Sequence, residues 1–184
     1  MDKNNDKGQD QQRQRGAYLT VYLNDHRAGA TVALELMTHL EKDAANYGSV
    51  APEESLRAFF TKLRADIEAD SQELEAIMER LGVTESRPRQ AAAWFSEKMA
   101  RLKLKMDDHG DGALRLLESL DVLASGIEGK RALWTALAAA SEGTPPVLPA
   151  TDWTRLIARA VEQHDRVEAL RLQAARAAFA PAQT

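Results

Sequence analysis

The most regular periodic pattern in the sequence is PEESLRAFFTKLRADIEADSQELEAIMERLG, residues 52–82. Its apolar residues recur at alternating steps of three and four, the spacing of one face of an α-helix. One member of the series is polar, Asp70. Proline is favoured in a first helical turn and glycine is a typical C-terminal cap, so we expect a helix from Pro52 to Gly82. The series comprises Leu56, Phe60, Leu63, Ile67, Asp70, Leu74, Ile77 and Leu81.

The same period recurs elsewhere, so the fold class is predicted to be all-α. The predicted helices cover residues 17–47, 52–82, 89–106, 113–141 and 152–179. Breakers separate them, such as the glycines of DDHGDG and the prolines that precede Thr151. No segment alternates with the period of two that would indicate a β-strand.

Four of the predicted helices have similar lengths of about 43 Å at 1.5 Å per residue, which favours a four-helix bundle. Short connections predict two antiparallel hairpins, 17–82 and 113–179. The segment between them is long enough to run the length of the bundle, as in the helical crossover of ferritin-like proteins; a simple up-down bundle is the alternative. We expect one helical-bundle domain over residues 17–180, preceded by a disordered N-terminal tail, residues 1–16.

Composition excludes several classes of protein. The chain has 184 residues and no cysteine, which rules out disulfides, thiolate metal sites and cysteine-based catalysis. A net charge of −4 gives no field that attracts nucleic acid or an anionic membrane. No apolar run approaches the roughly 20 residues that span a bilayer, and the polar tail is not a signal peptide. We therefore expect a soluble, cytoplasmic protein with no membrane or nucleic-acid partner.

Charge is distributed unevenly along the chain. Residues 66–79 carry six acids and no base, whereas residues 87–105 carry six bases and one acid. The simpler interpretation is two solvated helix faces of opposite sign that pack near each other. The alternative is a basic platform for an anionic partner.

Four stretches resemble a group of bacterial proteins of ferritin-like helical type. They are AYLTVYLNDHRAGATVALE (residues 17–35), IEADSQELEAIMERLGV (67–83), EKMARLKLK (97–105) and GIEGKRALW (126–134). The similarity covers most of the chain after residue 16. It implies a ferritin-like four-helix bundle but no activity, because the group has no function that could be carried over.

A ferritin-like dinuclear metal centre needs a Glu from each of two helices and a Glu-x-x-His pair from each of the other two. The chain has no Glu-x-x-His pair. Glu35 and His39 are four residues apart, while Glu162 and His164 are two apart and diverge by about 200° around a helix. We therefore expect no di-iron or di-manganese centre and no cofactor.

Four positions of the apolar series are polar: His26, Asp70, Lys130 and His164. Counting from the predicted helix ends places them at a similar height, and we expect Asp70 to contact Lys130 or His26. They could form a buried network that fixes helix register, or point to solvent, or line a small-molecule or mononuclear metal pocket that uses His26, Asp70 and His164. Lys130 argues against a metal, since its ammonium would repel a cation.

Two glycines, Gly126 and Gly129, lie within a turn of Lys130. Glycine is unfavourable inside a helix, so the pair predicts close approach of another helix or of a ligand. No catalytic motif is present in the sequence. The leading hypothesis is a non-catalytic helical-bundle protein that acts by interaction or in a stress response; the alternative is a ferritin-like metal or small-molecule binding protein with a modified centre. A homo-oligomer is compatible with either.

Overall fold

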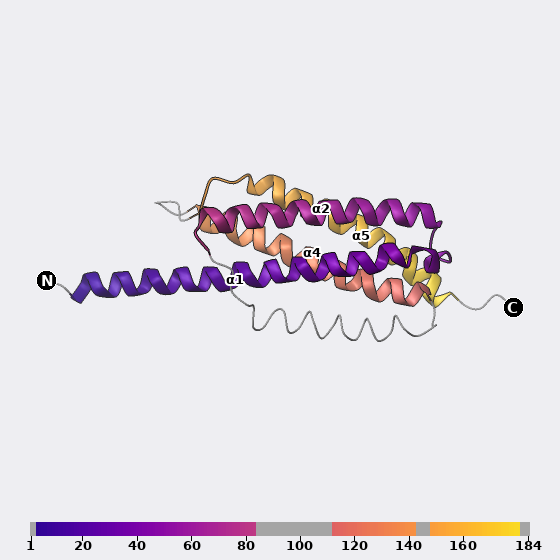
Figure 1. The fold of residues 1–184 in the computed structure, drawn as a ribbon, viewed down its shortest axis with the longest axis horizontal. Coiled ribbons are helices and arrows are strands. Elements are labelled where there is room, and N and C mark those ends of the chain that lie inside the picture. The colour runs from indigo at the N-terminus through magenta and orange to yellow at the C-terminus, as the bar shows by residue number, and fades with distance from the viewer. Residues whose placement is uncertain (1–2, 84–111, 143–147, 181–184) are drawn as a thin grey trace.

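The computed structural model describes residues 3–83, 112–142 and 148–180. These residues form four long α-helices and one short 3-10 helix (Figure 1). The elements are α1 (Lys3–Lys42), η1 (Ala44–Tyr47), α2 (Glu53–Arg80), α4 (Gly112–Ser141) and α5 (Trp153–Phe179). The described ranges contain no strand, which confirms the all-α prediction for this part of the chain. The helix expected over residues 89–106 lies outside the described residues.

Helix α2 has nearly the predicted bounds. It starts directly after Pro52, and Gly82 follows its C-terminal end with a φ of 63°, a left-handed conformation that glycine adopts without a steric cost. The N–H groups of Gly82 and Val83 donate to the carbonyl oxygens of Glu79 and Met78, both at 2.9 Å. These two hydrogen bonds provide donors for carbonyl groups in the last turn of the helix.

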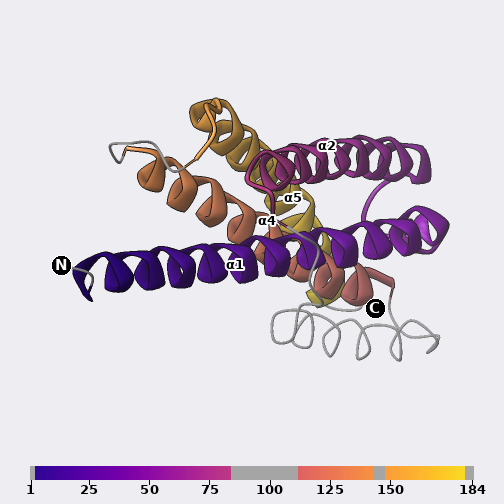
Figure 2. The same cartoon turned by 60° about the vertical axis from the view of Figure 1, so that its left-hand side comes forward.

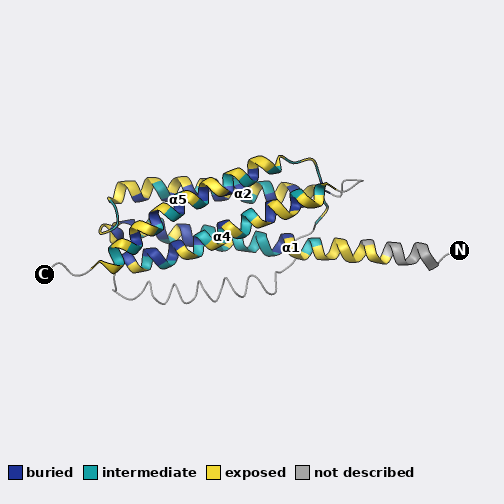
Figure 3. Ribbon diagram, turned by 180° about the vertical axis from the view of Figure 1, so that it is seen from behind, coloured by how far each residue is buried: buried dark blue, intermediate teal, exposed yellow. Residues whose placement is uncertain are grey.

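Helix α1 begins at Lys3, so it includes residues 3–16, for which the sequence predicted a disordered tail. Figures 1 and 2 show that this part of α1 projects beyond the other helices. Those side chains between residues 10 and 17 that the structure describes are exposed, as Figure 3 shows. The stretch is rich in Gln, Lys and Arg, and extending an existing helix costs far less than nucleating one. Helix α1 also ends earlier than predicted, at Lys42, and η1 follows.

The helices pack as two hairpins, α1 with α2 and α4 with α5. Their core consists of two apolar clusters, one toward each end of the bundle, and both draw on all four helices. The first includes Leu40, Phe60, Leu116 and Val167; the second includes Leu23, Ile77, Leu137 and Leu156. The early residues of α2 and α4 share the first cluster and their late residues share the second. Helices α2 and α4 therefore run parallel, and α1 and α5 run in the opposite direction.

The start of α4 lies against η1. A β-carbon at Gly112 would overlap the backbone carbonyl oxygen of Asn46, so only glycine fits at this point. The contact fixes the N-terminal end of α4 beside the C-terminal end of α1. Within the described residues, no helix is both long enough and apolar enough to cross a membrane.

Candidate functional site

The boundary between the two apolar clusters is polar. On α2 it is occupied by Asp70, which lies between Ile67 of the first cluster and Leu74 of the second. The Asp70 side chain is 3% exposed. Burial of a carboxylate is costly unless the charge is paired and hydrogen-bonded, so its partners determine whether this layer is stable.

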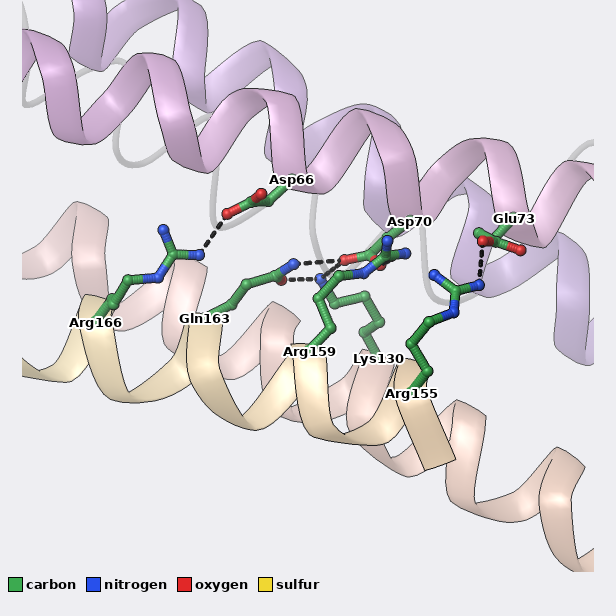
Figure 4. A network of polar contacts seen from close by, with 8 residues as sticks. All are labelled: Asp66, Asp70, Glu73, Lys130, Arg155, Arg159, Gln163 and Arg166. Carbon is green, nitrogen blue, oxygen red and sulfur yellow. Dashed lines mark hydrogen bonds and ion pairs between the residues drawn. The ribbon is translucent and has the colours of Figure 1, made fainter. Parts of the chain in front are cut away.

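Asp70 has partners on two other helices (Figure 4). Its Oδ2 accepts hydrogen bonds from Lys130 Nζ of α4 and, at 2.8 Å, from Gln163 Nε2 of α5. Lys130 Nζ also donates to Gln163 Oε1, which closes a three-residue ring. The other carboxylate oxygen, Oδ1, forms an ion pair with Arg159 of α5. Two cations therefore neutralise one carboxylate.

Lys130 reaches this layer from a position between Ile127 and Leu133 of α4, and its side chain is 15% exposed. Burial lowers the pKa of Lys130, and the negative charge and hydrogen bond of Asp70 oppose that shift. Asp70 thus keeps an ammonium group charged in a place where the apolar surroundings alone would favour the neutral amine.

Two further ion pairs flank Asp70 along the facing sides of α2 and α5. Arg166 pairs with Asp66, and Arg155 pairs with Glu73 at 2.5 Å. Figure 4 shows these pairs on either side of the ring of Asp70, Lys130 and Gln163. We call the set of ion pairs at Asp66, Asp70 and Glu73 the arginine ladder.

The arginine ladder gives the acid-rich segment partners on α5. Three arginines of α5 pair with the acids at 66, 70 and 73. The basic segment 87–105, which was expected to pack near these acids, lies outside the described residues, so that expectation stays a prediction. Arg155, Arg159 and Arg166 were not among the site residues predicted from the sequence. Their spacing in the sequence could have identified them, since steps of four and seven place them on one face of a helix.

The structure brings together two of the four predicted polar residues and places the others differently. Asp70 and Lys130 are in contact. His26 packs against the ring of Tyr22, with ring centroids 4.7 Å apart. Burial lowers the pKa of His26, while the charge of Asp25 raises it.

His164 does not belong to the buried layer. Its side chain is 36% exposed and lies near Asp165, with 3.9 Å between Nδ1 and Oδ1. The neighbouring residue, Gln163, is fully buried and takes the expected place. The buried stripe of α5 runs through Leu156, Ala160, Gln163 and Val167, whereas the stripe predicted from the sequence comprised Trp153, Ile157, Ala160, His164 and Val167. Both series have helical spacing, and they differ by one residue at the polar position.

A cavity of about 280 Å³, partly open to the surface, lies beside this layer between α1, α2 and α4. Its polar wall includes His26, Asp70 and Lys130, and the rest of the wall is mainly apolar. The apolar lining includes Val32, Ala33, Ile67, Leu74, Val122, Leu123, Ile127, Leu133 and Trp134. Figure 3 shows the buried faces of the helices directed toward the middle of the bundle.

The two glycines of α4 line this cavity. A β-carbon at Gly126 or Gly129 would have no described atom within 4 Å other than those of its own helix turn. The expected close approach of another helix is therefore not seen among the described residues. The glycines instead leave open space in the wall, which corresponds to the ligand alternative.

Across the described ranges, no three side chains of His, Asp or Glu are grouped closely enough to hold a metal ion. Exposure of His164 leaves His26 and Asp70 without the third ligand of the expected mononuclear pocket. The ammonium of Lys130 occupies the polar wall instead.

Comparison of the chain with protein-family models, with curated proteins and with solved structures gives no match. The resemblance to ferritin-like bacterial proteins therefore stays a prediction, and the geometry of the site carries the functional argument.

Proposed function

We propose that the protein is a non-catalytic, ferritin-like binding protein that holds a small apolar molecule in the cavity between α1, α2 and α4. The proposal keeps the non-catalytic role of the leading hypothesis and takes its site from the small-molecule alternative. The observation that carries it is open space in the middle of the bundle, beside Gly126 and Gly129. Protein interiors are normally close-packed, with few voids larger than a water molecule.

The size and chemistry of the cavity support an organic ligand. Its volume of about 280 Å³ exceeds the roughly 150 Å³ of an apolar cavity that stays dry and binds benzene. The wall is mainly apolar, with a few polar groups gathered at Asp70, Lys130 and His26. Small-molecule sites commonly combine an apolar lining with a few polar groups that fix orientation.

The ferritin-like crossover is part of the proposal. Helices α2 and α4 run parallel, so the end of α2 and the start of α4 lie at opposite ends of the bundle. This relation is the one expected when a long connection joins two hairpins, as in ferritin-like folds. In a simple up-down bundle, α2 and α4 would be antiparallel.

Filling the cavity tests the proposed function. Toluene is a suitable probe, and its binding is measured by ligand-observed NMR with the full chain. Gly126→Leu places a side chain in the open space and should abolish toluene binding. Gly16→Leu is the matched control, since Gly16 lies in the exposed part of α1 with nothing within 4 Å of a β-carbon.

The control should bind toluene as the unmodified protein does, and both variants should gain helix stability because leucine is a better helix former than glycine. Lack of toluene binding by the unmodified protein would overturn the proposal. Equal binding by the Gly126→Leu variant, with a folded structure shown by circular dichroism, would also contradict it.

A further inference from the structure

Asp25 of α1 is a charged residue of the cavity lining that is not paired within the described part of the chain. The lining contains two carboxylates, Asp25 and Asp70, and one ammonium, Lys130. Asp70 and Lys130 pair with each other, and both also contact side chains of α5. Asp25 has no hydrogen bond or ion pair with residues 3–83, 112–142 or 148–180, and its charge acts on the neighbouring His26. Asp25 is therefore free to pair with a bound molecule.

The carboxylate of Asp25 lies at the open side of the cavity. Asp25 is half-buried, and its oxygens are not among the fully buried side-chain atoms that lack a partner in the described ranges. Tyr22, three residues earlier on the same helix face, also lines the cavity and is 37% exposed. Other parts of the lining, such as Leu123 and Leu133, are almost fully buried. The cavity thus leads from a polar mouth on α1 to an apolar interior.

The surroundings of Asp25 favour a positively charged group at this mouth. A partly desolvated carboxylate is stabilised by an opposite charge within a few ångströms. The ring of Tyr22 adds to this preference, because the face of an aromatic ring attracts a cation. His26 does not provide the positive charge, since burial lowers its pKa and favours the neutral imidazole.

Lys130 does not neutralise Asp25 either, because its Nζ donates to Asp70 and Gln163. Among the described residues of the lining, the buried layer and the flanking ion pairs, acids outnumber bases by one. The acids are Asp25, Asp66, Asp70, Glu73 and Glu162, and the bases are Lys130, Arg155, Arg159 and Arg166. A ligand with one positive charge balances this set.

From this geometry we infer that the cavity ligand is a small apolar molecule bearing an ammonium group. The ammonium donates to the Asp25 carboxylate beside the ring of Tyr22, and the hydrocarbon part packs against the apolar lining. An ammonium fits because charge-assisted hydrogen bonds are roughly twice as strong as neutral ones. The inference rests on the proposed function, since it assigns the polar end of the same ligand.

A series of one-ring probes separates the two claims. Toluene, benzyl alcohol, benzylamine and benzoate share the ring and differ in the polar group. Their dissociation constants with the full chain are measured by NMR titration at neutral pH, where benzylamine is protonated and benzoate is ionised. Benzylamine should bind about tenfold more tightly than benzyl alcohol, a ratio that corresponds to one charge-assisted hydrogen bond. Benzoate should bind least tightly, since its carboxylate meets that of Asp25.

Asp25→Asn is the sharpest variant, because it removes the charge and keeps the shape of the side chain. Benzylamine affinity should fall to about that of benzyl alcohol, while toluene affinity should stay unchanged. Asp10→Asn is the matched control: it removes the same charge from the same helix, and Asp10 is exposed and does not line the cavity. Asp25→Lys gives a second variant, which should reverse the order so that benzoate binds more tightly than benzylamine.

The outcomes are distinct. If toluene does not bind, the proposed function is wrong. If toluene binds and benzylamine binds no more tightly than benzyl alcohol, the ammonium inference is overturned and the cavity remains a binding site. An Asp25→Asn variant that keeps the full preference for benzylamine would likewise overturn it.

Discussion

Gln163 of α5 connects the carboxylate of Asp70 on α2 to the ammonium of Lys130 on α4. Its Nε2 donates to Asp70 Oδ2 at 2.8 Å, while its Oε1 accepts from Lys130 Nζ. A carboxamide suits this place because it offers a donor and an acceptor at the same end of one side chain. Three helices are thereby joined by one closed ring of hydrogen bonds.

Removing this amide should destabilise the bundle. We expect Gln163→Ala to lower the free energy of unfolding by about 1–3 kcal/mol, because Lys130 loses an acceptor and Asp70 loses a donor in a buried place. His164→Ala is the matched control at the next residue. Its half-exposed side chain should matter by no more than about 0.5 kcal/mol. Urea unfolding of both variants decides whether the buried layer uses residue 163 or residue 164; a larger loss for His164→Ala would contradict the structure.

Truncation of Asp70 should be more costly. Asp70→Ala leaves Lys130 and Arg159 without their shared carboxylate, and breaking a buried ion pair in this way costs on the order of 3 kcal/mol. Asp165→Ala on α5 serves as the control, since the Asp165 side chain is 76% exposed and its loss should cost within about 0.5 kcal/mol. Equal denaturation midpoints for the two variants would show that the layer does not stabilise the fold.

The lowered pKa of His26 predicts a specific dependence of stability on pH. Burial is the main cause, and the unfolded chain keeps a pKa near 6.5. Between the lowered folded value and 6.5, the unfolded state binds more protons, so stability falls as pH is lowered through this window. His26→Gln should remove this contribution, and the loss of unfolding free energy between about pH 8 and about pH 5 should be smaller than in the unmodified protein. An unchanged loss would mean that His26 titrates alike in both states.

The metal content of the untreated protein can also be predicted. No Glu-x-x-His pair occurs in the sequence, and Lys130 occupies the polar layer. We expect elemental analysis of untreated protein to show no stoichiometric iron or manganese. Two metal ions per chain, released by a chelator with loss of stability, would contradict this expectation.

The apolar period identified the four described α-helices and the buried position of Asp70. On α2 the expected stripe from Leu56 to Ile77 is buried in the structure, with Asp70 as its polar member. Helical spacing is sufficient there because one face is apolar and the opposite face is strongly charged, so only one assignment of the buried side is possible. Equal heights in neighbouring helices also predicted the contact between Asp70 and Lys130.

The buried face of α5 could not be predicted in the same way. Its apolar and small residues allow two stripes, and choosing between Gln163 and His164 requires the rotation of α5 about its axis. That rotation depends on packing against α4 and on the arginine ladder, which are contacts between distant parts of the sequence. The cavity also could not be predicted from the sequence. A glycine in a helix is compatible both with close approach of another helix and with open space, as Gly126 and Gly129 show.

The contact between Gly112 and Asn46 has a consequence for the order of folding. The two hairpins, α1 with α2 and α4 with α5, are each built from segments close in sequence, whereas this contact joins the first hairpin to the start of the second. Closing the longer loop has the larger entropy cost, so each hairpin can form before the contact exists. We therefore expect a side chain at residue 112 to leave the formation of each hairpin unchanged and to slow the docking of one hairpin on the other.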